Sequence, residues 1–146
     1  MAFLSKSCVY GIRASIFVAL EEDKTRYIPI SEISEALGIS GHFLTKILQV
    51  LTQKGILTSY RGPKGGVKLK KTAEEVKLIE IVEAIDTLKI FEECILGLDG
   101  CGHFTPCPLH DEWRKSREKV ARNFREQSLF ELANNSKDIG FRLANL

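Results

Sequence analysis

The 146-residue chain contains no apolar run close to the ~20 residues that are needed to span a bilayer. Its N-terminus, Met1–Lys6, lacks the order of a secretory signal peptide, in which charge precedes an apolar run and a small-residue cleavage site. Internal repeats, low-complexity tracts, glycine-rich phosphate loops and nucleophile elbows are also missing. These absences predict a cytoplasmic protein that has no membrane partner and is not an enzyme.

The chain also lacks a strong excess of charge, since 21 basic and 19 acidic residues give a net charge of +2. The distribution is uneven, however. Residues 1–72 hold eleven Lys and Arg against five Asp and Glu, a balance of +6, whereas residues 73–146 have a balance of −4. A basic N-terminal half suggests a polyanionic partner, with nucleic acid as the first candidate. On charge alone, scattered charges on a solvated surface are the alternative.

Three helical segments open the chain. Apolar residues at three- and four-residue spacing predict the first over 5–20. Ser31 is an N-cap candidate for a second helix over 32–37, and Ser40 for a third over 41–54. Two short helices joined by a turn predict a helix-turn-helix, in which the second helix can enter a DNA major groove. Any other helical hairpin would share this pattern.

The outward face of the third helix favours DNA binding. It is polar, rich in hydrogen-bonding groups and free of acidic residues, whereas an ordinary solvated face usually includes Glu or Asp. Its members are His42, Thr45, Lys46, Gln49 and Gln53. We predict that the first four of these contact DNA.

A basic β-hairpin is predicted directly after this helix. Two strand-like runs, 56–60 and 67–70, flank a glycine- and proline-rich turn that carries Arg61 and Lys64. Such a hairpin is the wing of a winged helix, and Arg61 is a suitable side chain for a narrow minor groove. The order of turn, acid-free helix and basic wing predicts binding to double-stranded DNA. The fold class is then mainly α with a small β-hairpin, a winged helix-turn-helix of class α+β.

The second half of the chain is predicted to form a sensor and a dimerisation element. We divide the sequence into a DNA-binding region (1–73), a connecting helix with a cysteine-rich sensor loop (74–107) and a dimerisation helix with a C-terminal helix (108–146). A long helix over 109–126 carries a narrow apolar stripe, and we predict that this stripe packs on a second copy of the chain. The alternative is that it folds back on its own domain. Its members are Trp113, Val120 and Phe124.

Three cysteines lie within fourteen residues of the predicted loop. Cys94 and Cys101 are separated by six residues, and Cys101 and Cys107 by five, with His110 three residues further on. On a helix, residues three apart share a face, so Cys107 and His110 are candidates for ligating one metal. Thiolates suit iron–sulfur clusters and zinc. We favour iron–sulfur, because structural zinc sites usually contain closely spaced cysteine pairs.

Free thiols in a loop are a third interpretation of this cluster. The remaining cysteine, Cys8, is interpreted as a small buried residue of the first helix.

The chain resembles the Rrf-type winged-helix regulators of bacteria, the family of IscR, NsrR and CymR, over essentially its whole length. The turn of the wing is the most diagnostic part of this resemblance. The segments that carry it are Leu4-Ser5-Lys6, Tyr10-Gly11-Ile12-Arg13-Ala14, Ile33–Ile39, Phe43-Leu44, Arg61-Gly62-Pro63-Lys64-Gly65-Gly66, Cys94…Cys101…Cys107-Pro108-Leu109-His110 with Trp113, and Ser128-Leu129-Phe130-Glu131-Leu132.

The resemblance implies a homodimer whose long helices cross and carry two winged heads to a near-palindromic operator. It also implies that the three cysteines ligate an iron–sulfur cluster, of 2Fe–2S or 4Fe–4S type, that senses iron–sulfur supply, nitric oxide or redox state. Base and groove contacts would fall on His42, Thr45 and Arg61. The alternative function is a cluster-free DNA-binding regulator that is switched by thiol oxidation or by a partner protein.

The sequence departs from the family pattern in two ways. The gap between Cys94 and Cys101 is one residue longer than the usual five. Val9 stands where some members have a carboxylate that ligates the partner chain's cluster. The cluster type is therefore open, and His110 is the expected fourth ligand.

Overall fold

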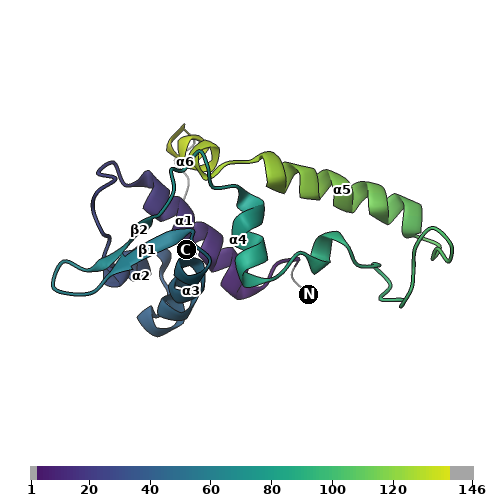
Figure 1. The fold of residues 1–146 in the computed structure, drawn as a ribbon, viewed down its shortest axis with the longest axis horizontal. Coiled ribbons are helices and arrows are strands. Elements are labelled where there is room, and N and C mark those ends of the chain that lie inside the picture. The colour runs from purple at the N-terminus through teal and green to yellow at the C-terminus, as the bar shows by residue number, and fades with distance from the viewer. Residues whose placement is uncertain (1–2, 139–146) are drawn as a thin grey trace.

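A computed structural model describes residues 3–138 of the chain. Its elements form a helical head, which consists of residues 3–86 and 128–138, and one long arm, which consists of residues 87–127 (Figure 1). In chain order they are α1 (Lys6–Leu20), α2 (Ile30–Leu37), α3 (Gly41–Gln53), β1 (Leu57–Tyr60), β2 (Gly66–Leu69), α4 (Leu78–Ile85), the 3₁₀ turn η1 (Lys89–Phe91), α5 (His110–Glu126) and α6 (Leu129–Asp138). The predicted α+β class, mostly helical with one hairpin, is confirmed. Residues 139–146 of the predicted C-terminal segment lie outside the described part.

Local side-chain chemistry sets several of the helix ends. The hydroxyl of Ser40 accepts a hydrogen bond from the N–H of Phe43 at 3.2 Å, so Ser40 caps α3 as predicted. Gly38 ends α2 in the left-handed conformation, with φ 66°. Ser128 and Glu131 form a capping box at the start of α6, since each accepts a hydrogen bond from the backbone N–H of the other.

The predicted start of α2 was wrong. Ser31 is not its cap, because the helix begins at Ile30, two residues before the predicted start at Glu32, and Pro29 occupies the N-cap position. Pro29 holds its own backbone extended, at φ −60° and ψ 142°, and no side chain caps this end. Proline is suited to this junction because its φ is fixed near the value that a helix start requires.

The core of the head is built around α1. Apolar side chains of α1, α2, α3 and both strands form one buried cluster, to which Leu129 and Ala133 of α6 also belong. Helices α1 and α4 approach closely, since a Cβ on Gly11 would overlap the side chain of Ile85. A second cluster joins Cys8 to Val82, Phe91 and Ala121, and so links the head to α5.

The wing is an antiparallel hairpin with a third segment attached to it. β1 and β2 pair from Leu57 opposite Leu69 to Tyr60 opposite Gly66. Ile28, which precedes α2, exchanges two backbone hydrogen bonds with Val67 at 2.8 and 2.9 Å. The wing is therefore anchored through Val67, near its turn, to the chain between α1 and α2.

The arm leaves the head and returns to it. Figure 1 shows α5 extended along the long axis, with the cysteine loop running beneath it from the end of α4 to the far end of α5. The N–H of Leu78 donates to the carbonyl of Gln127 at 2.9 Å, and that of Leu129 to the carbonyl of Val76 at 2.8 Å. These bonds fix the near end of α5 beside α4. Among the described residues, no helix has both the length and the apolar character to cross a membrane.

Candidate functional site

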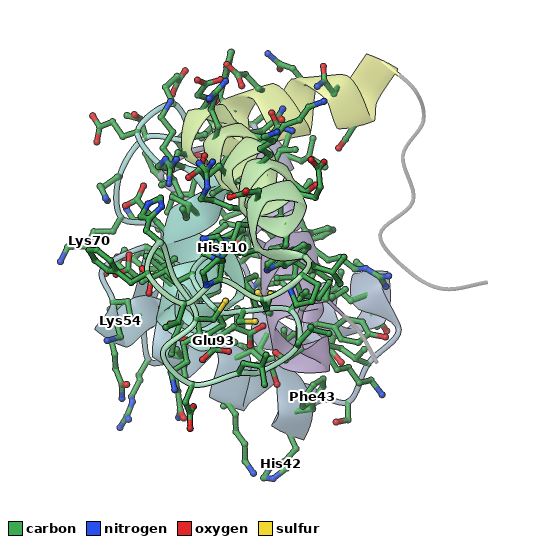
Figure 2. The ribbon with its side chains drawn as sticks, turned by 90° about the vertical axis from the view of Figure 1, so that its right-hand side faces the viewer. His42, Phe43, Lys54, Lys70, Glu93 and His110 are labelled. Atoms are coloured by element: carbon green, nitrogen blue, oxygen red, sulfur yellow. The ribbon has the colours of Figure 1, made fainter. Side chains whose placement is uncertain are left out.

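Helix α3 presents the predicted polar face to solvent. His42, Lys46 and Gln49 are exposed on it, and Figure 2 shows His42 extending away from the body of the protein. Thr45 is half-buried, and its hydroxyl donates a hydrogen bond to the carbonyl of Gly41 at 2.6 Å. Its oxygen lone pairs remain as acceptors. The helix directly precedes the wing in the chain and packs against β1, so the polar face and the wing belong to the same part of the head.

The tip of the wing is exposed and shaped by glycine. Arg61 and Lys64 are both exposed, and between them Gly62 has a φ of 134°, which an L-residue rarely adopts. A Cβ on Gly65 would overlap the carbonyl oxygen of Tyr60. The turn can therefore form only with glycine at these positions, and this explains the glycine-rich stretch seen in the sequence.

Two tyrosines beside the turn of the wing were not predicted as part of this surface. The rings of Tyr27 and Tyr60 lie 5.6 Å apart, and the ammonium of Lys68 lies 4.7 Å from the centre of the Tyr27 ring. This places a cation over an aromatic face, a stabilising geometry. Tyr60, at the edge of the predicted turn, was the available signal, but its pairing with Tyr27 across 32 intervening positions cannot be read from spacing.

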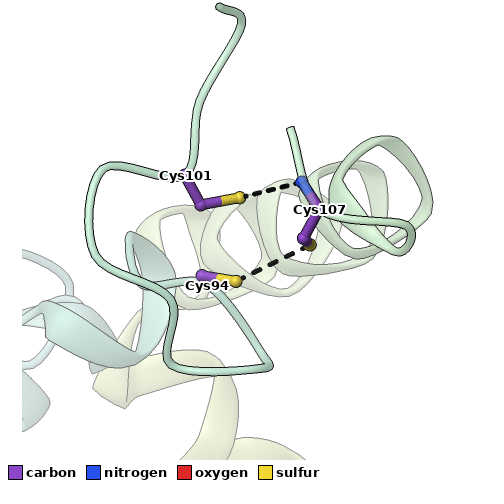
Figure 3. A group of neighbouring side chains, drawn as sticks. All are labelled: Cys94, Cys101 and Cys107. Atoms are coloured by element: carbon purple, nitrogen blue, oxygen red, sulfur yellow. Dashed lines mark hydrogen bonds between the residues drawn. The ribbon is translucent and has the colours of Figure 1, made fainter. Parts of the chain in front are cut away.

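The three loop cysteines converge at the start of α5 (Figure 3). Their sulfur atoms all lie within 4.8 Å of one another. The Sγ atoms of Cys94 and Cys107 are 3.6 Å apart, and the N–H of Cys107 donates to the Sγ of Cys101 at 3.3 Å. All three are half-buried and none is in a disulfide. Single cysteines at wide spacing thus form one compact donor set.

His110 completes this cluster from α5. It is the first residue of the helix, is only 8% exposed, and its Nδ1 lies 3.3 Å from the Sγ of Cys101. Its buried Nε2 has no hydrogen-bond partner among the described residues. The expectation that Cys107 and His110 share one helical turn was wrong, because α5 begins only at His110. The loop, not a helix, brings the two residues together.

The environments of the cysteines differ in their effect on thiol ionisation. Hydrogen bonding from the backbone of Leu98 lowers the pKa of Cys94 to about 7, whereas burial raises the pKa of Cys107. Burial, together with the nearby carboxylate of Asp86, raises the pKa of Cys8 to about 12. Cys8 is the buried residue of the first helix that the sequence predicted, its raised pKa keeps the thiol protonated, and it lies outside the donor set.

The donor chemistry fits a group that prefers sulfur. Three thiols within 4.8 Å and an adjacent imidazole are ligands of iron–sulfur clusters and of zinc. An orphaned, buried ring nitrogen is costly unless something binds it. The residues present therefore fit the iron–sulfur cluster that the sequence predicts.

The stripe predicted for a dimer interface packs partly on its own chain. The ring of Phe124 lies 5.4 Å from that of Phe91, and Val120 packs against the cluster around Cys8. Trp113 donates its indole N–H to the carbonyl of Glu93 at 2.9 Å. All three side chains remain half-buried. Their role between two copies of the chain stays a prediction.

Comparisons with known proteins agree with this architecture. Residues 4–135 match the Rrf2 family, described as iron-dependent transcriptional regulators. The HTH-type transcriptional regulator IscR of Photorhabdus laumondii is 33% identical over 128 residues, which cover 88% of this chain and 77% of the relative. The relatives that carry a name are transcriptional regulators rather than enzymes.

Solved structures give the same result for the fold. CymR of Bacillus subtilis, the global cysteine regulator, superposes with a TM-score of 0.79 at 20% identity, covering 92% of this chain and 98% of CymR. CymR of Staphylococcus aureus has a TM-score of 0.71 at 26% identity, with coverages of 88% and 96%. The IscR of T. potens has a TM-score of 0.73 at 20% identity, with coverages of 94% and 90%. The match over residues 4–135 shows that this chain belongs to the Rrf2 family of transcriptional regulators.

Proposed function

We propose that this protein is a dimeric bacterial regulator that binds operator DNA in the cytoplasm and is controlled by an iron–sulfur cluster. The observation that carries the proposal is the donor set at the start of α5. Three sulfur atoms lie within 4.8 Å of one another, beside a buried imidazole with an unpaired nitrogen. The proposed ligands are Cys94, Cys101, Cys107 and His110.

DNA binding is proposed to use α3 and the wing together. His42, Thr45, Lys46 and Gln49 would meet the major groove, where their donors and acceptors can contact base edges and phosphates. Arg61 and Lys64 would reach the neighbouring backbone or minor groove from the tip of the wing. The balance of +6 over residues 1–72 supports this assignment, because phosphate neutralisation supplies much of the affinity.

A dimer is proposed because one head covers only a short half-site. Two copies related by a two-fold axis would read two half-sites of a near-palindromic operator. Trp113, Val120 and Phe124 keep part of their surfaces exposed on α5, and they are the proposed interface residues.

When bound, the cluster would supply a redox- and nitric-oxide-sensitive inorganic core. The protein residues would hold this core, exclude water from one side of it through the buried ring of His110, and order the loop. The loop joins α4, which packs on α1 and α3, to α5. A change in how well the loop is ordered would therefore be transmitted through α4 to the DNA-binding head.

The cluster is tested by anaerobic purification or reconstitution, followed by visible absorption and by iron and sulfide analysis. We expect a coloured wild-type protein, no chromophore after serine replacement of any of the three cysteines, and an altered spectrum or faster cluster loss in His110→Ala. Cys8→Ser is the matched control and should keep the chromophore, because Cys8 lies in the core and outside the donor set. A colourless wild type, or zinc in place of iron and sulfide, would contradict the proposal.

A second candidate function is regulation by thiol oxidation without a cluster. The 3.6 Å separation of the Cys94 and Cys107 sulfurs favours it, because a small approach would form a disulfide. Oxidation by hydrogen peroxide would remove two electrons and two protons from the thiols and yield two waters. Mass spectrometry after peroxide treatment of metal-free protein distinguishes the two functions: a Cys94–Cys107 disulfide that changes DNA affinity supports this candidate.

A further inference from the structure

The backbone carbonyl of Glu93, directly before Cys94, receives two side-chain hydrogen bonds from α5. The indole Nε1 of Trp113 donates at 2.9 Å, and the Nη1 of Arg117 donates at 3.2 Å. Trp113 and Arg117 are four residues apart and therefore lie on the same face of the helix. A carbonyl oxygen has two lone pairs, so both bonds form together. We call these two bonds the Glu93 clamp.

The clamp holds the chain to α5 by side-chain hydrogen bonds directly before the cysteine loop begins at Cys94. Just upstream, the ring of Phe91 packs on Phe124 of α5, and the N–H of Glu93 donates to the carbonyl of Lys89. Just downstream, the side chains of Ile95, Leu96 and Leu98 are about half exposed. The segment is thus held as far as residue 93 and faces solvent after residue 94.

The same helix also positions the other side of the cysteine cluster. His110 begins α5 and lies 3.3 Å from Cys101, and Trp113 is one turn further along. Glu93 directly precedes Cys94 in the chain, and His110 lies beside Cys101. The clamp therefore fixes the position of Cys94 relative to α5, the helix that also carries His110. Donor atoms bind a metal group well only when supporting residues hold them in place.

We propose that Trp113 and Arg117 are positioning residues for the cysteine site. By holding the Glu93 carbonyl, they keep the Cys94 sulfur against Cys107 and reduce the opening of the loop. This role deepens the proposed iron–sulfur function and rests on it, but the two hydrogen bonds of the clamp are formed by protein atoms alone. It assigns to Trp113 a task within one chain, in addition to any contact with a second copy.

The first test is hydrogen exchange of the metal-free protein, resolved over residues 92–99. Trp113→Phe removes one donor and keeps an aromatic ring, and Arg117→Met removes the other. Each should speed exchange in this segment about fivefold, as expected for loss of one ordinary hydrogen bond. Arg117→Lys keeps a donor and should restore slow exchange in part. Lys115→Met is the control, because the Lys115 side chain is 65% exposed and its ion-pair partner is Glu112, on the same helix.

The second test measures cluster loss to an iron chelator after reconstitution of the same variants. The double variant Trp113→Phe, Arg117→Met should lose its chromophore at least tenfold faster than the Lys115→Met control. Circular dichroism melting should show that all variants stay folded at the temperature of the measurement. Unchanged exchange over 92–99 in the double variant would overturn the clamp. Faster exchange with unchanged cluster loss would overturn its positioning role.

The two proposals fail separately. A wild-type protein that assembles no cluster would contradict the proposed function, and hydrogen exchange of that same protein would still decide whether the clamp holds the loop.

Discussion

Single backbone atoms decide where glycine is required in the wing. Gly66 has a φ of 155°, and a Cβ built on it would overlap the carbonyl of Ile28, whose hydrogen bonds to Val67 anchor the hairpin. An added methyl group therefore meets both an unfavourable backbone conformation and a fixed neighbouring strand. Gly41, at the start of α3, has no heavy atom within 4 Å of the corresponding position.

We accordingly expect Gly66→Ala to lower the free energy of unfolding by about 2–3 kcal/mol, since strain at such a position costs that order of energy. DNA affinity should fall as well, because the wing would detach from Ile28. Gly41→Ala should leave stability unchanged or slightly raised, as is usual for alanine in a helix. Denaturant unfolding checks both variants, and equal stabilities would contradict the role given to Gly66.

The start of α4 depends on one carboxylate. Glu80 accepts hydrogen bonds from the ammonium of Lys71 at 2.8 Å and from the backbone N–H of Lys77 at 2.8 Å. Burial would raise the pKa of Glu80, but the hydrogen bonds, led by that of Lys71, outweigh it and lower the pKa. The ionised form is therefore the one that the folded protein favours.

Because the folded-state pKa of Glu80 is depressed, its contribution to stability is present above the unfolded value near 4.5 and is lost as the pH falls through the folded value. We expect Glu80→Gln to destabilise the protein by less than about 1 kcal/mol at pH 7, since the side chain is a third exposed. The difference from wild type should shrink as the pH falls below 4. Urea unfolding at several pH values measures it, and a difference independent of pH would assign the effect to packing instead.

The helical elements were predictable from sequence to different degrees. The cap of Ser40 was predicted from local chemistry, and Gly38 and the capping box of Ser128 are features of the same kind, because each depends only on neighbours a few residues away. Ser31 misled the prediction, since proline at 29 starts the helix without a side-chain cap. The loop between Cys94 and Cys107 could be recognised from its cysteines, but its path, and so the contact of His110 with Cys101, depends on tertiary packing.

The stripe on α5 illustrates the limit of pattern reasoning at this scale. Apolar residues at helical spacing indicate that one face of a helix is covered, but they do not identify whether the same chain or a second copy covers it. In this structure Phe91 and the cluster around Cys8 cover part of it. The role of Trp113 as a donor to Glu93 had no signal in sequence, because the acceptor is a backbone carbonyl.

The proposed dimer makes a prediction at Val120. Val120→Glu places a charge in an apolar seam, and burial of an unpaired charge is costly. We expect a shift from dimer to monomer in sedimentation velocity, with a moderate loss of thermal stability because Val120 also packs on its own chain. Lys119→Glu, one residue away and exposed, is the control and should remain dimeric. An intact dimer in Val120→Glu would show that Val120 does not belong to the interface.

DNA binding by the whole molecule makes a further prediction. Arg61→Ala should weaken binding to the operator by ~1–3 kcal/mol if Arg61 reads a base edge or groove shape, with relaxed specificity at that position. If Arg61 contacts only phosphate, the loss should be similar for all sequences and the salt dependence should become shallower by about one counterion. Lys119→Ala is the matched control, since it removes a positive charge on the arm. Fluorescence anisotropy of labelled duplexes at several salt concentrations measures each case.

The indole beside Cys94 has a consequence for how the protein can be observed. The chain contains a single tryptophan, Trp113, and its N–H is bonded to the residue that precedes a proposed ligand. All indole emission therefore comes from one known position next to the sensor loop. An iron–sulfur chromophore bound there would accept excitation energy and shorten the emission lifetime. The unlabelled protein thus carries its own optical probe of occupancy, which can be followed while it is bound to DNA.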